Sequence, residues 1–140
     1  MNDASIPPEY PQPTRTPANA PLLDAWARGE LLLQQCEDCG AKVFFPRELC
    51  PACWSPRLAW KRSAGTGTIV SWTRIHRHIH AAFTAEAPTL LAEVKLDDGW
   101  LMIARILAKD GAAVASGTRV EPVPMPDAAR FPLPTFRALE

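Results

Sequence analysis

The sequence has no excess of charge of either sign and no long apolar run, and both absences exclude classes of protein. Lysine and arginine number 15, and aspartate and glutamate also number 15, so the formal net charge is zero. A dedicated nucleic-acid binder depends largely on neutralising phosphates, which argues against that function here. Proline or polar residues break every apolar stretch well before the roughly 20 residues that a membrane span needs, so we expect no transmembrane helix.

The amino-terminal residues also lack the basic start and apolar centre of a secretory signal, since Asp3, Glu9 and Arg15 stand among prolines. We therefore expect a cytoplasmic protein. Cysteine is scarce, with 4 in 140 residues. In a reducing compartment, paired cysteines indicate metal ligands, and disulfides are the alternative.

The cysteines have the spacing C-x2-C-x10-C-x2-C, formed by Cys36, Cys39, Cys50 and Cys53. Each pair offers two thiolates from one tight turn, and the intervening segment is long enough to bring the second turn opposite the first. This arrangement suits tetrahedral zinc, with iron in a rubredoxin-like site as the alternative metal. Because four thiolates fill the coordination shell, we expect a structural ion that leaves no position for substrate or activated water.

The residue after each second cysteine differs between the two turns. Gly40 can take a positive φ at low cost and let backbone amides approach the sulfurs. Trp54 holds the equivalent position, where a bulky residue takes that conformation only with strain. We therefore expect the second turn to be differently shaped or mildly strained.

The first 20 residues contain prolines at positions 7, 8, 11, 13 and 17 and predict an extended arm that is ordered where it packs on something. A short helix over 21–28 follows. Pro21 suits its first turn, Asn19 could cap it, Gly29 ends it, and Asp24 and Arg28 form an i,i+4 pair.

The remaining apolar segments predict a mainly β protein. Segments 30–35 and 42–46 read as strands of a zinc ribbon. Five later segments predict a small closed antiparallel barrel of the OB type, with Asp97-Asp98-Gly99 as a hairpin turn and Asp110-Gly111 as another turn: 58–63, 67–79, 89–97, 100–107 and 119–124. Gly65-Thr66-Gly67 is interpreted as the bend entering the barrel. We expect the tail from Arg130 to Glu140 to pack on this barrel, with presentation of its apolar groups to a partner as the alternative. The chain then divides into an arm and helix (1–34), a ribbon (35–57) and a barrel with its tail (58–140).

Positive charge is concentrated in one part of the chain. Gln35 to Phe83 contains seven Lys or Arg and three Asp or Glu, whereas Thr84 to Ala129 contains four and seven. On a continuous strand His76, His78 and His80 would share one face. Three interpretations stay open: a second metal site, a solvated strand end, or a site in which Arg74, His76 and Arg77 hold an anionic ligand or subunit. Since no nucleophile motif, phosphate-binding loop or carboxylate pair is present, a self-sufficient active site is not expected.

The sequence resembles the DUF35 family of zinc-ribbon and OB-fold proteins over about residues 21–137. The resemblance rests on these segments: Leu22-Leu23-Asp24-Ala25-Trp26, Gly29-Glu30-Leu31-Leu32-Leu33, the cysteine motif with Phe44-Phe45-Pro46-Arg47, Gly65 to Thr73, His76-Arg77, Phe83, Pro88 and Leu133 to Arg137. Trp54 in place of glycine, and His78-Ile79-His80-Ala81 in place of a proline-containing stretch, depart from the family pattern.

The resemblance implies an amino-terminal arm, a rubredoxin-like ribbon with structural Zn²⁺ and a carboxy-terminal OB barrel. It implies an accessory subunit without catalysis of its own, in a hetero-oligomer with a thiolase-fold or lipid-transfer-type enzyme acting on acyl-CoA. Arg74, His76, Arg77 and Phe83 are the residues that we expect to contact CoA or the partner. The alternatives are a module that binds single-stranded nucleic acid and a free-standing acyl-CoA binding protein.

Overall fold

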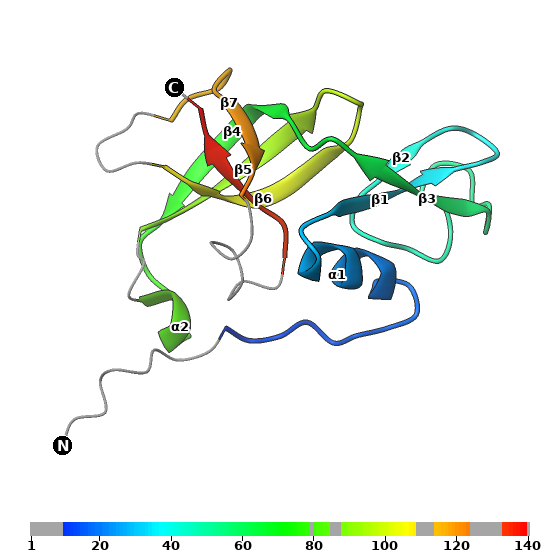
Figure 1. Ribbon diagram of the computed structural model, residues 1–140, viewed down its shortest axis with the longest axis horizontal. Helices are drawn as coiled ribbons and strands as arrows, with labels where there is room; N and C mark the ends of the chain where they lie inside the picture. The colour runs from blue at the N-terminus through cyan, green and yellow to red at the C-terminus, as the bar shows by residue number, and fades with distance from the viewer. Residues whose placement is uncertain (1–9, 79, 85–87, 109–113, 124–132, 140) are drawn as a thin grey trace.

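The computed structural model describes residues 10–78, 80–84, 88–108, 114–123 and 133–139 (Figure 1). Its helices and strands form a helix-supported three-stranded ribbon beside a closed five-stranded barrel. In chain order the elements are α1 Ala20–Ala27, β1 Leu31–Cys36, β2 Lys42–Val43, β3 Leu58–Ser63, β4 Gly67–Ile75, α2 Ala81–Thr84, β5 Thr89–Leu96, β6 Leu101–Leu107, β7 Arg119–Pro122 and β8 Thr135–Ala138. The mainly β fold with an amino-terminal helix, a ribbon and a five-stranded barrel is confirmed.

Helix α1 lies within one residue of its predicted bounds and ends as predicted, at Gly29, whose φ is +80°. Asn19 stands at the N-cap but makes no side-chain cap bond. Its side chain instead orders the arm, because Oδ1 accepts from the Thr16 N–H at 2.8 Å and Nδ2 donates to the Thr14 carbonyl at 2.9 Å. The Asp24 carboxylate pairs with Arg15 rather than with Arg28.

The ribbon sheet has the order β2-β1-β3, with both neighbours antiparallel to β1. Strand β3 runs along the whole of β1, from Leu31 opposite Ser63 to Cys36 opposite Leu58. The prediction that 58–63 is a barrel strand was therefore wrong, since this segment completes the ribbon. How the chain divides into domains stays a prediction.

The barrel closes in the order β4-β5-β6-β8-β7, and its one parallel pair is β6 with β8. This strand order is that of an OB-type barrel. The segment that replaces 58–63 in the barrel is β8, in the carboxy-terminal tail. Phe136 on β8 is fully buried, which confirms that the tail packs on its own barrel.

Strand β4 ends at Ile75, four residues before its predicted end, and a short helix α2 follows at Ala81. The three histidines therefore do not lie on one continuous strand. The hairpin predicted at Asp97-Asp98-Gly99 joins β5 to β6, with Gly99 at φ +111°. The turn predicted at Asp110-Gly111 lies outside the described residues.

One hydrophobic core extends through the helix, the ribbon and the barrel. It contains Leu22 from α1, Leu31 and Leu33 from β1, and the inward residues of the barrel strands. Gly65 and Gly67 lie where the chain passes from one sheet to the other. A Cβ at Gly65 would lie 2.3 Å from Pro122 Cγ, and one at Gly67 would lie 2.6 Å from the Lys95 carbonyl oxygen, so close approach explains the predicted bend.

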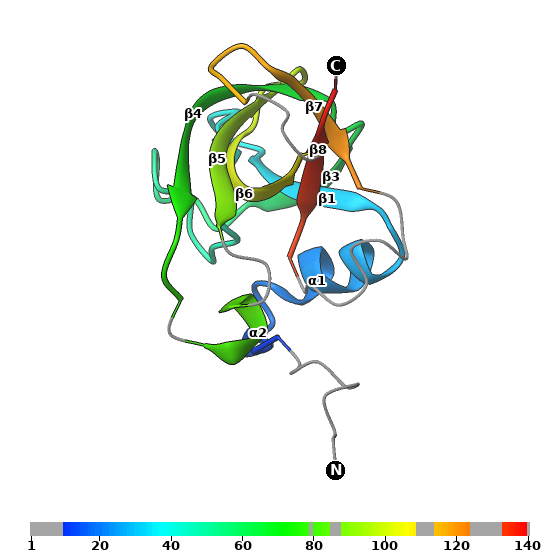
Figure 2. The same ribbon diagram turned by 90° about the vertical axis from the view of Figure 1, so that its left-hand side faces the viewer.

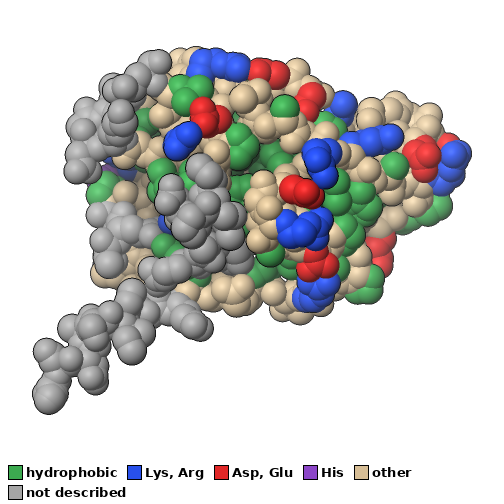
Figure 3. All heavy atoms as spheres, in the orientation of Figure 1, with side chains coloured by type: hydrophobic (Ala, Val, Ile, Leu, Met, Phe, Trp, Pro, Cys, Tyr) green, Lys and Arg blue, Asp and Glu red, His purple; other side chains and the backbone are tan. Residues whose placement is uncertain are grey.

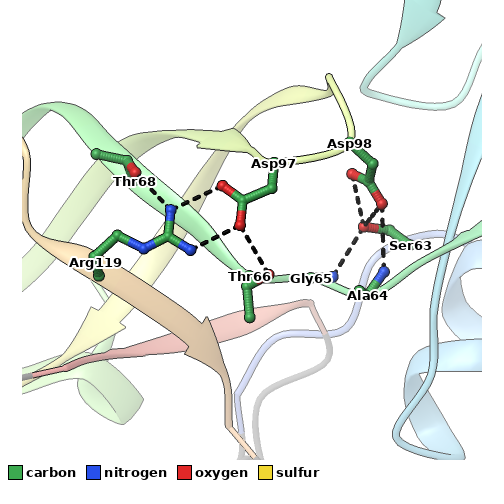
Figure 4. Close-up of polar contacts among 8 residues, drawn as sticks. All are labelled: Ser63, Ala64, Gly65, Thr66, Thr68, Asp97, Asp98 and Arg119. Atoms are coloured by element: carbon green, nitrogen blue, oxygen red, sulfur yellow. Dashed lines mark hydrogen bonds and ion pairs between the residues drawn. The ribbon is translucent and has the colours of Figure 1, made fainter.

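Polar contacts fix the ribbon to the β5–β6 hairpin (Figure 4). The Asp98 carboxylate accepts a hydrogen bond from the Ser63 hydroxyl of the ribbon at 2.9 Å. Within the barrel, the adjacent Asp97 forms an ion pair with Arg119 at 2.7 Å. The hydrogen bond from Arg119 lowers the pKa of Asp97 to about 2. The buried Trp100 Nε1 donates to the Gln34 carbonyl of β1 at 2.7 Å. The hairpin therefore connects the two sheets directly.

Candidate metal centre and partner surface

The four cysteine sulfurs converge on one point at the end of the ribbon. All four lie within 4.8 Å of one another, and the Cys36–Cys53 and Cys39–Cys50 Sγ pairs are each 3.6 Å apart. Zinc bound tetrahedrally at about 2.3 Å requires sulfurs about 3.8 Å apart. The thiols therefore lie close to the arrangement that a tetrahedral ion requires.

The two cysteine turns have the same backbone shape. The Gly40 N–H donates to the Cys36 carbonyl at 3.0 Å, and the Trp54 N–H donates to the Cys50 carbonyl at 2.8 Å. Gly40 has φ +77° and Trp54 has φ +68°. The second turn was expected to be either differently shaped or mildly strained. The structure shows the same shape as in the first turn, with strain at Trp54 because a tryptophan takes a left-handed conformation there. The Trp54 side chain is 76% exposed, so packing does not offset the strain.

Backbone N–H groups point at the sulfurs, as thiolate ligands require. The Cys39 N–H donates to Cys36 Sγ at 3.5 Å, and the Ala52 N–H donates to Cys50 Sγ at 3.4 Å. The bond from Cys39 lowers the pKa of Cys36 to about 6. At Cys53 the Ser55 N–H acts in the same direction, but burial and the neighbouring thiols together raise the pKa to about 12. The pKa of Cys39 is raised as well and that of Cys50 is lowered, so the protons that a dication displaces on binding lie mainly on Cys39 and Cys53.

The donor set defines what this centre can do. Four thiolates complete the shell of a zinc ion and leave no open position for a substrate or water. Cys36 and Cys50 are buried, which keeps two of the four sulfurs from solvent. The ion in such a site would hold the ends of β1 and the second cysteine turn together, so its contribution is structural.

The predicted contact residues lie at the end of β4, directly after it and on α2. Arg74 is exposed, with its guanidinium carbon 5.5 Å from the centre of the Trp72 ring. His76 and Arg77 are exposed in the segment that follows. Phe83 on α2 is half-buried, with its ring centre 5.1 Å from that of Tyr10 and 5.6 Å from that of His78. Their role as contacts stays a prediction.

The histidines are separated by their local structure. His78 Nε2 lies 3.0 Å from the Thr89 hydroxyl on β5, whereas the Ala82 N–H donates to His80 Nδ1 at 3.0 Å at the start of α2. Among the described residues, the cysteines are the sole group of His, Cys, Asp or Glu placed to hold a metal. The interpretation of the histidines as a second metal site has no support in this part of the chain.

Sequence reasoning missed a cluster that joins the arm to the barrel. Tyr10 and Arg105 are both buried, and Arg105 Nη1 donates to the Tyr10 hydroxyl at 3.3 Å. Their positions are 95 residues apart in sequence. The one available signal was an arginine inside the apolar run of β6, which cannot be buried without polar partners.

Charges on the surface are mixed. On the face drawn in Figure 3, Lys and Arg side chains alternate with Asp and Glu side chains and make no extended basic field. Exposed ion pairs contribute to this pattern, including Arg57 with Asp38 and Arg62 with Glu30. Among the described residues, no helix has the length and apolar character needed to cross a membrane.

Two family models match adjoining parts of the chain. Residues 23–59 match the model described as the rubredoxin-like zinc ribbon domain of ChsH2, and residues 60–123 match that of the C-terminal OB-fold domain of ChsH2. The first match contains all four cysteines. The segment that the family model identifies as a zinc ribbon is therefore the segment in which the structure brings the four thiols together.

Similar proteins include a DUF35 domain-containing scaffold protein of Pyrococcus furiosus, 30% identical over 89 residues that span 64% of each chain. The structure resembles a chain of the Ltp2-ChsH2(DUF35) aldolase, with TM-score 0.71 and 28% identity over 91% of this chain and 98% of that one. A DUF35 protein of unknown function from Sulfolobus solfataricus shares the fold, with TM-score 0.62 and 13% identity over 88% and 86% of the two chains. The ribbon, the barrel and these relatives together show that the chain belongs to the DUF35 family of ChsH2-type zinc-ribbon and OB-fold proteins.

Proposed function

We propose that this chain is a non-catalytic accessory subunit of a hetero-oligomeric enzyme that acts on acyl-CoA, with a thiolase-fold or lipid-transfer-type protein as its partner. The observation that carries the proposal is the similarity to a chain of the Ltp2-ChsH2(DUF35) aldolase, which extends over 98% of that chain. A relative described as a scaffold protein supports the same role.

The chemistry of the metal centre supports a subunit without catalysis of its own. The four sulfurs saturate the ion, so the centre offers neither a Lewis acid with an open position nor an activated water. Chemistry on a thioester would then belong to the partner.

The exposed cations at the end of β4 and directly after it supply the surface that we propose for CoA or for the partner. Arg74, His76 and Arg77 follow one another within four positions and are all exposed. Guanidinium groups form charge-assisted hydrogen bonds to phosphates, of which CoA carries three, and to carboxylates. Phe83 contributes in this proposal by holding α2 against the arm.

The direct test is to purify the chain with the thiolase-fold protein of its own host and to assay both separately and together. We expect a stable complex, no thioester turnover by the lone chain, and partner activity that rises on addition of this chain. A partner that is fully active and soluble alone, with no complex detected by sedimentation, would overturn the proposal. Turnover of a thioester by the lone chain would also overturn it.

Charge-reversal variants test the proposed surface. The double variant Arg74→Glu and Arg77→Glu should weaken either the complex or the apparent affinity for acyl-CoA by 10-fold or more. The matched control is Lys61→Glu, which reverses an exposed charge on β3, away from the end of β4. Equal behaviour of the double variant and the control would remove these residues from the proposal while leaving the subunit role intact.

A further inference from the structure

The second half of strand β4 is paired on one side only. Strand β5 pairs with the whole of β4, from Gly67 to Ile75. On the other side, in the described part of the chain, β7 pairs with Gly67 and Thr68 alone, and backbone bonds from the turn before β7 end at Ile69. Figure 2 shows β7 meeting β4 at the start of the strand, whereas the end of β4 lies at the margin of the barrel. Residues 71–75 therefore form a strand edge that no other described strand covers.

This free edge is exposed on both faces of the strand. A strand that covers a core on one face alternates between buried and exposed residues, as β5 largely does. In β4 this alternation ends at Ile69, and all residues from Val70 to Arg74 are exposed. Val70 is 46% exposed and Trp72 is 41% exposed. Another chain can therefore approach the edge without displacing a described side chain.

The register of β4 shows which backbone groups point away from β5. Ile69 lies opposite Val94 and bonds the turn before β7 through both its N–H and its carbonyl. Past a bulge between Ile69 and Ser71, Trp72 and Arg74 lie opposite the β5 residues two and four positions before Val94. Pair types alternate along an antiparallel ladder, so these two pairs are of the same type as the pair at Ile69. The N–H and C=O groups of Trp72 and Arg74 therefore point to the free edge.

The edges of the ribbon differ from this one, because they carry features that prevent pairing with another chain. Strand β2 has two residues, and β3 has the exposed Lys61 and Arg62. Short edge strands and charged edge residues both discourage strand addition. The free part of β4 instead carries residues that favour strands, such as Trp72 and Thr73, with Arg74 as its single charge. This edge of the barrel thus remains open to pairing.

An open groove beside the edge has room for the side chains of an added strand. It has a volume of about 360 Å³, and its lining includes Ser71 and Thr73 of β4, Leu91 and Glu93 of β5, and Ile103 of β6. Ser71 and Thr73 are small and leave space above the β5 residues that lie opposite them. When a peptide is added to a sheet, main-chain bonds supply affinity, and pockets for alternate side chains supply specificity. The groove can supply this specificity.

Charge at the end of the edge indicates the chemistry of the occupant. Arg74, His76 and Arg77 are exposed, and none of them forms an ion pair with a described residue. The first residues of an antiparallel added strand would lie beside this basic end, where carboxylates would form charge-assisted hydrogen bonds. Residues 70–78 contain no Asp or Glu, so the same edge of a second copy cannot supply these carboxylates. A different chain with an acidic extended segment fits better.

We propose that the partner subunit adds an extended segment to the free edge of β4 as an antiparallel strand, with acidic residues at its start beside Arg74, His76 and Arg77. The proposal rests on the accessory role proposed above and names the contact by which the partner is held. Backbone bonds to Trp72 and Arg74 fix the added strand, and its alternate side chains enter the groove.

Hydrogen exchange tests the proposal on the lone chain and on its purified complex with the thiolase-fold protein of its own host. The N–H groups of Trp72 and Arg74 have no partner in the ladder with β5, so they should exchange rapidly in the lone chain. In the complex their exchange should slow by about 10-fold or more, since each gains a hydrogen bond. The edge of β3 is the internal control and should exchange at the same rate in both samples.

A matched pair of variants separates the backbone contact from the side-chain contact. Trp72→Pro and Trp72→Val both remove the indole, but only the proline removes the N–H at the free edge. An edge position whose N–H faces solvent accepts proline. Trp72→Pro should therefore bind the partner about 10-fold more weakly than Trp72→Val, with equal zinc content in the two variants. Ser71→Trp, which fills the groove and keeps the backbone N–H, is a second test if the proline variant does not fold, and it should also weaken the complex.

Two results would overturn this proposal and leave the accessory role intact: a complex in which Trp72 and Arg74 exchange as rapidly as in the lone chain, or equal partner affinity of Trp72→Pro and Trp72→Val. Normal partner affinity of Ser71→Trp would exclude the groove from the contact. Absence of any complex would remove both the accessory role and the added strand. Self-association of the lone chain that Trp72→Pro abolishes, without slower exchange in the complex, would assign the edge to a second copy and contradict the proposal.

Discussion

The ribbon and the barrel lie side by side but are stabilised by different means. In the ribbon, β2 has two residues, and the loops between strands are held by cysteine turns. In the barrel, five strands surround a core of mainly aliphatic side chains, and this core includes the fully buried Phe136. The ribbon therefore depends on a metal ion for stability that the barrel obtains by burying apolar surface.

The two regions are nevertheless not independent. Leu31 and Leu33 of the ribbon are part of the barrel's core, and Trp100 of the barrel bonds the backbone of Gln34. The Lys42 ammonium also lies 4.2 Å from the centre of the Trp100 ring. The metal thus stabilises the cysteine end of the ribbon, whereas the other end of the ribbon is held by the hydrophobic core that it shares with the barrel. Variants that perturb one region at a time test whether the two regions depend on different interactions.

The largest effect is expected from removing a metal ligand. Cys50→Ser should remove much of the roughly 10 kcal/mol that zinc contributes to a small module. Hydrogen exchange should show that residues 36–57 lose protection while β5 and β6 keep theirs. Ala52→Ser, an exposed non-ligand in the same turn, is the control. Loss of protection in both regions together would show that the two regions unfold as one unit.

A somewhat smaller effect is expected from the barrel. Phe136→Ala should lower the free energy of unfolding by about 3–5 kcal/mol, because it leaves a cavity in a fully buried position. Zinc content should stay unchanged. Leu139→Ala, at a position that is 37% exposed, should cost about 0.5 kcal/mol or less. Denaturant unfolding with parallel metal analysis distinguishes these outcomes, and zinc loss in Phe136→Ala would contradict the separation of the two means of stabilisation.

The contact between the regions should matter less than either core. Trp100→Phe leaves the Gln34 carbonyl without its indole donor and should cost about 1–3 kcal/mol. Hydrogen exchange should increase most in β1, on the ribbon side of the contact. Trp72→Phe serves as the control, since Trp72 is 41% exposed and belongs to the barrel. Equal effects of the two variants would deny this bond a role in joining the sheets.

The smallest effect is expected within the ribbon, where the two cysteine turns can be compared directly. Trp54→Gly relieves a left-handed tryptophan and should stabilise the protein by about 0.5–1 kcal/mol, after the greater backbone entropy of unfolded glycine is counted. Gly40→Ala should destabilise it by about 1–2 kcal/mol, although a Cβ there meets nothing within 4 Å. Thermal unfolding measures both. Destabilisation by Trp54→Gly would mean that the indole contributes more than its exposure suggests.

The sequence predicted the metal centre better than the barrel because cysteine spacing is a local signal. Two C-x2-C pairs identify the ligands, and both turns have the backbone that such pairs need. Alternating apolar residues located most barrel strands, but alternation does not say which strands pair. Segment 58–63 was placed in the barrel for this reason, although it pairs with β1.

Strand β8 could not be identified from its own residues. It has four residues, follows Pro134 and pairs with β6 and β7, which are distant in the chain. The buried contact between Tyr10 and Arg105 likewise depends on where the arm returns to the barrel, and sequence proximity carries no information about it. Both features depend on long-range packing rather than on local pattern.

The metal content of the folded chain, measured by native mass spectrometry on protein purified without added metal, tests directly whether an ion holds the ribbon together. One zinc ion per chain is predicted, together with its loss when Cys50 is replaced by serine. A folded chain with a protected ribbon and no bound metal would contradict the claim that four thiolates and one ion hold this half of the molecule together.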